Sequence, residues 1–270
     1  MNARLRTESV TVGYGGDPVV RDLSLDLADG HVTTIVGPNG CGKSTLLRTM
    51  SRLLRPTSGT VYLDGESIHD VHTRQVARTM ALLPQSPIAP DGLLVRDLVG
   101  RGRHPHQRWF SQWSPEDEQI VDRALEMTDT AALRDRPLDQ LSGGQRQRAW
   151  IAMTLAQDTD LLLLDEPTTY LDLAHQVEIL DLVTRLNRER GRTVVMVLHD
   201  LNLAARYSDT IVVMKDGVVV TQGAPTDVFT PALLATTFGL AADILPDPRT
   251  GLPIIVPTTQ LRELADAPHS

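Results

Sequence analysis

The sequence predicts an α/β fold, and three observations indicate it. Buried apolar runs that are typical of strands recur along the chain, at residues 31–36, 80–83, 161–164 and 193–198. Helical patterns lie between them, such as the stretch from Leu173 to Arg190. The first apolar run leads through a glycine-rich loop directly into a helical segment. Strands that alternate with helices are typical of a sheet with parallel strands covered by helices.

The composition indicates a protein with a packed core. The chain has 270 residues, of which 41% are hydrophobic and 22% are charged. The net charge of −8 argues against a nucleic-acid partner, because binding to phosphates depends on positive charge. No apolar run approaches the roughly 20 residues of a membrane span, and residues 1–6 lack the apolar core of a signal peptide. We therefore expect a cytoplasmic protein, and the single Cys41 cannot form an internal disulfide.

The glycine-rich loop fits the phosphate-binding pattern G-x-x-x-x-G-K-[ST]. Its residues are Gly37, Pro38, Asn39, Gly40, Cys41, Gly42, Lys43, Ser44 and Thr45. Glycine lets the backbone approach a ligand closely, and the loop then directs its N–H groups at an anion. Lys43 would add a charge between the β- and γ-phosphates, and the Ser44 hydroxyl would hold Mg²⁺. Cys41 is interpreted as a small filler, with a redox switch as the alternative.

Short strands are expected on both sides of this loop. Residues 7–12, 20–27 and 31–36 have alternating or continuous apolar residues, and Asp29-Gly30 predicts a hairpin between the last two. Tyr14 lies among glycines between the first two strands. An aromatic side chain here could stack on adenine, and the alternative is an ordinary tyrosine at a strand end.

The segment from residue 56 to 85 predicts a turn, a strand at 60–63 and a helix at 73–78. A buried strand at 80–83 then ends near Gln85. An uncharged glutamine in that place can orient a water molecule or complete a Mg²⁺ shell.

Residues 86–113 differ in character, with prolines, a helical run near 95–99 and a cluster of aromatic residues. His104 and His106 could indicate a metal, but Pro105 between them and the absence of nearby cysteines favour a surface loop. The aromatic residues could form a local core or a docking surface; they are Trp109, Phe110 and Trp113.

Two helix starts follow. Ser114 precedes a proline and acidic residues, which is typical of an N-cap, and the helix has its apolar face at residues 120–125. Ser142 is expected to cap a helix that ends near Gln157. The two glycines after Ser142 would leave N–H groups free for an anion.

Two strand ends then present polar residues. The apolar strand 161–164 ends in Asp165-Glu166, at the edge where ligands bind in open α/β sheets. Asp165 could hold Mg²⁺ through water, and Glu166 could draw a proton from an attacking water. The next strand, 193–198, ends in His199, which could contact the γ-phosphate; a structural histidine is the alternative. A hairpin about Asp216-Gly217 and a second one across residues 247–251 complete the chain.

Together these residues resemble the ATP-binding subunits of ABC transporters. Residues 37–45, Gln85, 141–145, 161–166, Asp172 and His199 match the Walker A, Q-loop, signature, Walker B, D-loop and H-loop of that family, in order, and Tyr14 matches its adenine-stacking aromatic. The resemblance implies a P-loop NTPase fold with a mixed central sheet, an antiparallel β subdomain and a helical signature subdomain. It implies an ATP-binding domain at 1–235, with the helical subdomain at about 86–158, and a C-terminal extension at 236–270.

The resemblance also implies the roles of the site residues. The catalytic group comprises Glu166, His199 and Gln85. ATP would be bound by Tyr14, residues 37–45, Ser142, Gly143, Gly144, Gln145 and Asp172, and Mg²⁺ by Ser44, Gln85 and Asp165. Two copies would pair head to tail, so that the signature of one meets the Walker A loop of the other. The pair would be peripheral to the cytoplasmic face of the inner membrane, bound to permease subunits and indirectly to a periplasmic or lipoprotein substrate-binding protein.

Residues 80–85, 101–105, 165–172 and 199–202 are similar to the subgroup that powers import of iron–siderophore complexes. Importers of haem or vitamin B12 are close alternatives. An ABC ATPase that acts on ribosomes or nucleic acid is another, although only about a hundred residues lie between Walker A and the signature, with no sustained heptads. An export subunit is disfavoured by the subgroup resemblance.

Overall fold

The computed structural model describes residues 3–107 and 113–258, and its largest sheet has six strands in the order β10-β9-β3-β8-β7-β6. These strands are β3 (Val32–Val36), β6 (Met80–Leu83), β7 (Leu161–Asp165), β8 (Thr193–Val197), β9 (Thr210–Lys215) and β10 (Val218–Gly223). All neighbours are parallel except β9 and β10, which form the hairpin expected about Asp216-Gly217. The mixed central sheet is therefore confirmed.

A second, antiparallel sheet has the order β2-β1-β4-β5. Its strands are β1 (Ala3–Val12), β2 (Val20–Ala28), β4 (Ser58–Leu63) and β5 (Glu66–Ser67). The hairpin predicted at Asp29-Gly30 is wrong, because β2 pairs with β1 while β3 lies between β8 and β9 in the other sheet. The turn instead links the two sheets, and Thr193 holds it: its Oγ1 accepts from the Gly30 N–H (2.8 Å) and donates to Asp29 Oδ1 (2.7 Å).

The burial patterns explain why these two strands separate. β2 alternates buried and exposed residues, as a strand with one solvated face does. All five residues of β3 are buried, so this strand belongs inside a sheet that is covered on both faces. A turn signal between two apolar strands does not by itself distinguish these arrangements.

Most helices lie close to the positions expected from the sequence, but no helix was expected at residues 225–238. The helices are α1 (Lys43–Met50), α2 (Thr73–Thr79), α3 (Val95–Gly100), α4 (Pro115–Met127), α5 (Gly143–Ala156), α6 (Leu173–Arg190), α7 (Leu201–Tyr207), α8 (Pro225–Val228) and α9 (Pro231–Leu233), and a π-helix follows at Leu234–Phe238. Ser114 and Ser142 form the expected N-caps, each in a capping box. Gly191 ends α6 in a left-handed conformation, with φ of 64°.

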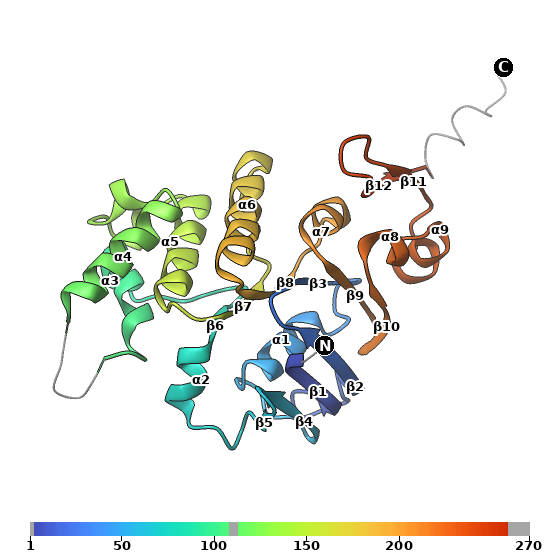
Figure 1. Cartoon of the computed structure of the whole chain (residues 1–270), viewed down its shortest axis with the longest axis horizontal. Helices are drawn as coiled ribbons and strands as arrows, with labels where there is room; N and C mark the ends of the chain where they lie inside the picture. Colours follow the sequence, from blue (N-terminus) through green and yellow to red (C-terminus); the bar gives the residue numbers. More distant parts are fainter. Residues whose placement is uncertain (1–2, 108–112, 259–270) are drawn as a thin grey trace.

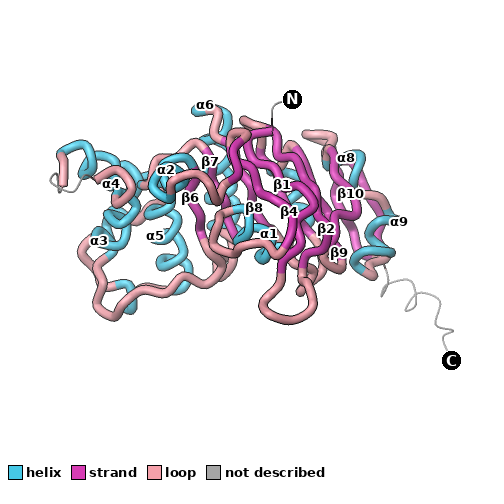
Figure 2. The backbone as a smooth tube through the Cα atoms, turned by 90° about the horizontal axis from the view of Figure 1, so that it is seen from below, coloured by secondary structure: helices cyan, strands magenta, loops and turns pink. Residues whose placement is uncertain are grey.

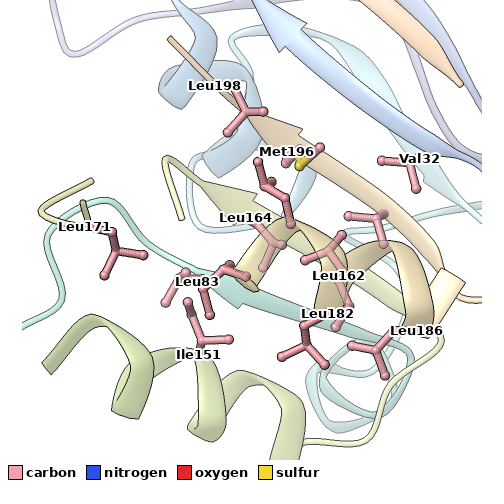
Figure 3. Close-up of a cluster of buried hydrophobic side chains, with 14 of the residues drawn as sticks. Val32, Leu83, Ile151, Leu162, Leu164, Leu171, Leu182, Leu186, Met196 and Leu198 are labelled. Atoms are coloured by element: carbon pink, nitrogen blue, oxygen red, sulfur yellow. The ribbon is translucent and has the colours of Figure 1, made fainter. Parts of the chain in front are cut away.

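Both faces of the six-stranded sheet are buried. One face packs against α1 and the antiparallel sheet, through Leu46, Leu47 and Met50 of α1. The other face contacts α5, α6 and α7. Figure 3 shows this second contact, where Leu162, Leu164 and Met196 of the sheet lie near Ile151, Leu182 and Leu186 of the helices. Close packing on both faces fixes the strands, and therefore the points at which the loops at the strand ends begin.

Helices α3, α4 and α5 pack on one another at one end of the molecule, as Figure 1 shows. The strands form the centre, and Figure 2 shows them in magenta between that helical end and the C-terminal elements. The expected C-terminal hairpin is present as β11 (Ala242–Pro246) and β12 (Pro253–Pro257), beside α7. No helix in the described ranges has the length and apolar character needed to cross a bilayer.

Candidate nucleotide-binding site

The glycine-rich loop connects the end of β3 to the start of α1. Gly42, the N-cap of α1, has φ of 102°, a left-handed conformation that favours glycine. Gly37 approaches β9 so closely that a Cβ atom there would lie 2.2 Å from the carbonyl oxygen of Met214. Only glycine fits at that position. The loop therefore delivers its backbone to a helix N-terminus, where amide groups and the helix dipole favour an anion.

Lys43 places a positive charge inside this loop. The side chain is buried, and its Nζ donates hydrogen bonds to the carbonyl oxygens of Gly37 (2.8 Å) and Pro38 (2.9 Å). Because these bonds run back to the start of the loop, the ammonium group lies within its curve. A phosphate that binds to the loop amides would meet this charge directly.

Ser44, at the start of α1, contacts Asp165, the last residue of β7. The Ser44 hydroxyl donates to Asp165 Oδ1 (2.9 Å), which brings the start of α1 to the end of β7. Asp165 is 1% exposed, and burial raises the pKa of its carboxyl, a shift that the hydrogen bond from Ser44 opposes. A hydroxyl and a single carboxylate suit Mg²⁺, which takes oxygen ligands and keeps several waters or phosphate oxygens. This donor set fits the predicted metal.

Glu166 and His199 follow adjacent parallel strands. His199 Nε2 lies 2.6 Å from Glu166 Oε1, and Thr169 donates to the other carboxylate oxygen of Glu166 (3.2 Å). Glu166 is 8% exposed and has φ of 53°, an uncommon backbone conformation for a residue with a side chain. The carboxylate is thus fixed at both oxygens, as a positioned base or ligand would need to be.

One cavity of about 450 Å³ joins most of these groups. It is lined by Tyr14, Val19, Asn39, Gly40, Gly42, Lys43, Ser44, Thr45, Gln85, Glu166 and His199. Gln85 follows the end of β6, so three parallel strands and the loop after β3 all contribute to the cavity. Asp165 lies beneath the lining through its bond to Ser44. A volume of this size is typical of small-ligand sites.

Tyr14 forms the edge of this cavity. It lies in the loop between β1 and β2 and is 60% exposed, and its hydroxyl is 3.5 Å from Thr45 Oγ1. The ring is therefore held near the phosphate-binding loop with much of its surface open to a flat ligand. Base stacking on such a ring is worth about 1–3 kcal/mol.

A second cavity, of about 480 Å³, holds the other residues predicted to bind nucleotide. It is lined by Ser142, Gly143, Gly144, Gln145, Arg148, Tyr170, Leu171, Asp172 and His175. Ser142 Oγ accepts from the Gln145 N–H (3.2 Å), and Gln145 Oε1 accepts from the Ser142 N–H (3.1 Å), which fixes the start of α5. The two cavities share no lining residue, so one chain does not bring the two predicted groups together.

Asp172 joins this second cavity as the N-cap of α6. Its Oδ1 accepts from the His175 N–H (3.0 Å) and lies 2.6 Å from His175 Nδ1. Hydrogen bonds from the His175 backbone and side chain lower the pKa of Asp172. Asp172 therefore stays ionised beside the start of α5.

Sequence reasoning missed several residues of the two cavities. Arg148, Tyr170 and His175 of the second cavity were not assigned a role, and neither was Thr169, which bonds to Glu166. His175 carried a signal, because a polar residue three positions after a helix cap faces that cap. The place of Arg148 on α5 gave no such signal, since its neighbours come from α6 and the loop before it.

Three other predictions concern Cys41, the histidines at 104 and 106, and the aromatic residues at 109–113. Cys41 is 5% exposed and burial raises the pKa of its thiol, which favours the filler interpretation. His106 Nε2 lies 2.8 Å from the Gln157 carbonyl oxygen, and no cluster of three metal-ligating side chains occurs in residues 3–107 and 113–258. Trp113 is 45% exposed and lines a larger cavity of about 650 Å³ on the helical end, whereas Trp109 and Phe110 lie outside the described residues.

Comparison with known proteins places the chain among transport ATPases. The family described as ABC transporter matches residues 20–169. The chain is 54% identical to the iron(3+)-hydroxamate import ATP-binding protein FhuC of Bacillus subtilis, over 93% of each protein. It is 51% identical to the ferric enterobactin transport ATP-binding protein FepC of Escherichia coli, over 94% of each.

Solved structures agree with the fold. One chain of an ABC transporter in an inward-facing conformation aligns with a TM-score of 0.81 and 28% identity, over 98% of this chain and 100% of its own length. A bacterial ABC transporter cassette, solved as a dimer, aligns with a TM-score of 0.75 and 30% identity, over 82% of this chain and 98% of its own.

Proposed function

The chain belongs to the family of ABC transporter ATP-binding subunits, which are ATPases, and on that premise we propose that it energises import of an iron(III)–siderophore complex through a separate permease. The observation that carries the choice of substrate is the pair of siderophore-import relatives, at 54% and 51% identity over more than nine-tenths of each chain. Haem and vitamin B12 are the alternative cargoes.

The first cavity is proposed to bind the triphosphate of ATP. The loop 37–42 and Lys43 supply N–H donors and a buried positive charge where the β- and γ-phosphates would lie. Tyr14 would stack on adenine at the edge of the cavity, because its ring is exposed and close to Thr45. Both interactions bind nucleotide without changing it.

Ser44, Asp165 and Gln85 are proposed to hold Mg²⁺. The Ser44 hydroxyl and the Asp165 carboxylate are already in contact, and Gln85 lines the same cavity. When bound, the ion neutralises charge that develops on the phosphate oxygens during hydrolysis. The uncharged Gln85 would add an oxygen ligand without adding a second negative charge.

Glu166 is proposed as the general base and His199 as a donor to the γ-phosphate. Glu166 is fixed by Thr169 and His199, so its carboxylate can accept a proton from a water aligned with the γ-phosphorus. The His199 ring contacts the Glu166 carboxylate and lines the same cavity. From there it can reach an oxygen of the γ-phosphate.

The second cavity is proposed to complete the site of another copy. Ser142, Gly144 and Asp172 are too separate from the phosphate-binding loop of their own chain to line one cavity with it. In a two-fold pair, the same two surfaces meet twice, so each nucleotide would lie between the loop of one chain and the start of α5 in the other. Loss of the γ-phosphate would remove contacts that hold the pair closed.

The remaining assignments concern place and partners. We propose residues 1–235 as the ATP-binding domain, with the helical subdomain at about 86–158, and residues 236–270 as an extension. Gln85 and residues 86–113 would contact the permease at the cytoplasmic face of the inner membrane, while a substrate-binding protein delivers the cargo from the other side. This segment includes α3 and the partly exposed Trp113 at the helical end of the molecule, which supports a contact surface there.

Uptake of radiolabelled iron chelates tests the cargo. Cells that lack this chain are compared with cells that carry the wild-type chain or its Lys43→Ala variant. We expect one or more ferric siderophores to fail to accumulate unless the wild-type chain is present, while haem and vitamin B12 enter normally. Unchanged uptake of every siderophore would overturn the proposed cargo and leave the ATPase assignment intact.

A further inference from the structure

The C-terminal hairpin is attached to α7 through one side chain. Asn202, the second residue of α7, uses both ends of its amide on the backbone of Ile255 in β12. Its Oδ1 accepts from the Ile255 N–H (2.7 Å), and its Nδ2 donates to the Ile255 carbonyl oxygen (3.3 Å). The side-chain amide therefore pairs with the backbone of β12 as a neighbouring strand would. Figure 1 shows β12 beside α7.

Apolar packing supports this attachment. Ile255 is 5% exposed and Ala242 is 7% exposed, and both belong to the core cluster that contains Leu203 and Ala204 of α7. The outer face of the hairpin is different, since Leu245 is 51% exposed. The hairpin thus lies with one face on the helix, and Asn202 fixes its register there.

The first turn of α7, which contains Asn202, closely follows a residue of the proposed site. Asp200 is the N-cap and accepts from the Leu203 N–H (2.9 Å), and His199 immediately precedes it, 2.6 Å from Glu166. With seven residues, α7 is too short to be stable without tertiary contacts. The His199 side chain is 48% exposed, so few contacts other than Glu166 hold it.

We propose that Asn202 is a positioning residue for ATP hydrolysis. By joining the hairpin at residues 242–257 to the first turn of α7, it keeps His199 against Glu166. The extension would then contribute to turnover without touching nucleotide. This inference rests on the role proposed for His199.

Steady-state ATPase measurements on the full chain, assembled with its permease, test the inference. We expect Asn202→Ala to lower kcat about fivefold and to change the KM for ATP less than twofold, because it loosens a group that acts in the transition state and not one that binds ATP. Hydrogen exchange at the α7 amides should also become faster. If the alanine variant does not fold, Asn202→Asp, which keeps an acceptor for the Ile255 N–H, is measured against the same criterion.

Asn187 offers a matched control. Its amide likewise bonds to the backbone, because Nδ2 donates to the carbonyls of Gly30 (2.8 Å) and Arg192 (2.7 Å), but at the opposite end of the sheet from His199. We expect Asn187→Ala to lower the Tm and to leave kcat unchanged. Equal kcat values for the Asn187 and Asn202 variants would overturn the inference. A His199→Ala variant with wild-type turnover would instead overturn the role of His199 itself.

Discussion

His199 Nε2 and Glu166 Oε1 lie 2.6 Å apart, at the ends of two adjacent parallel strands. Glu166 is the first residue after β7, and His199 is the second residue after β8. Both side chains line the same cavity as the phosphate-binding loop. The register of the sheet places both groups at one edge, which is where ligands bind in open α/β sheets.

Glu166→Gln is expected to lower kcat for ATP hydrolysis by about 10²–10⁴-fold, because an amide cannot accept the proton of the attacking water. Nucleotide affinity should stay near the wild-type value, since the glutamine keeps the size of the side chain. Steady-state ATPase rates and nucleotide-binding titrations measure both quantities. Glu178→Gln, at an exposed position on α6, is the control. Turnover at the wild-type rate in Glu166→Gln would show that another group is the base.

Asp165→Asn is expected to raise the thermal stability of the metal-free protein and to weaken its binding of Mg²⁺–ATP. Burial raises the pKa of Asp165, so the ionised carboxylate costs the folded state free energy at pH values above that pKa. The cost disappears below the ordinary pKa of about 3.8, where the carboxyl is protonated in both states. At neutral pH and without Mg²⁺, the variant should therefore have a higher Tm than the wild type.

The same Asp165→Asn variant should bind Mg²⁺–ATP more weakly, because a neutral amide oxygen is a poorer ligand for Mg²⁺ than a carboxylate. Thermal unfolding with and without Mg²⁺–ATP, at pH 7 and at acid pH, provides the measurement. A lower Tm for the metal-free variant at neutral pH would contradict the prediction.

Two inactive variants are expected to restore activity when mixed. Lys43→Ala removes the charge in the first cavity, and Ser142→Arg blocks the second. If each nucleotide lies between two chains, a mixed pair contains one intact site and one site with both changes. ATPase activity should therefore rise on mixing and exceed that of either variant alone. Activity that remains at the level of the separate variants, although mixed pairs form, would mean that each chain uses its own residues only.

Asp117→Ala is expected to destabilise the helical end. Asp117 Oδ1 accepts from Arg103 Nε (2.8 Å), and both side chains are buried, so the change leaves an unpaired buried charge that costs about 3–5 kcal/mol. An exposed pair, Arg96 and Asp135, provides the control, since Asp135→Ala should cost about 0–1 kcal/mol. Denaturant unfolding at neutral pH measures both. Equal losses in the two variants would contradict the burial argument.

The Asp117 pair should also depend on pH. Burial acts to raise the pKa of Asp117, but hydrogen bonds from Arg103 and Ser114 outweigh it, and the pKa is lowered overall. The stabilisation is therefore fully present above the ordinary pKa of about 3.8 and is lost as pH falls through the lowered value. The difference in stability between wild type and Asp117→Ala should shrink in that acid range.

Tyr14→Ala is expected to weaken ATP binding by about 1–3 kcal/mol, the usual contribution of one base stacked on an aromatic ring. Tyr14→Phe keeps the ring and removes only the hydroxyl, whose contact with Thr45 is 3.5 Å, so its affinity should stay close to that of the wild type. Fluorescence titration with a nucleotide measures both variants. Equal affinity of wild type and Tyr14→Ala would assign the tyrosine to the loop alone.

Local patterns predicted most elements and the first cavity. The glycine positions at 37 and 42 and the N-caps at Ser114 and Ser142 depend on a few neighbouring residues, so the sequence alone could predict them. The hairpin predicted at Asp29-Gly30 failed for the opposite reason. Its turn chemistry was read correctly, but the partner of β3 is chosen by burial on both faces of the larger sheet.

The sequence by itself determined the chemistry of this protein: a phosphate-binding loop, acidic residues at one strand end, a histidine at another and a capped, glycine-rich helix start, because each depends on residue types at short spacing. Only the tertiary structure decided which of them meet. It placed Glu166 against His199 and Ser44 against Asp165, kept Ser142 and Asp172 in a separate cavity, and fastened Asn202 to the C-terminal hairpin. These relationships depend on strand order and sheet register, which are set by the burial of side chains far apart in the chain.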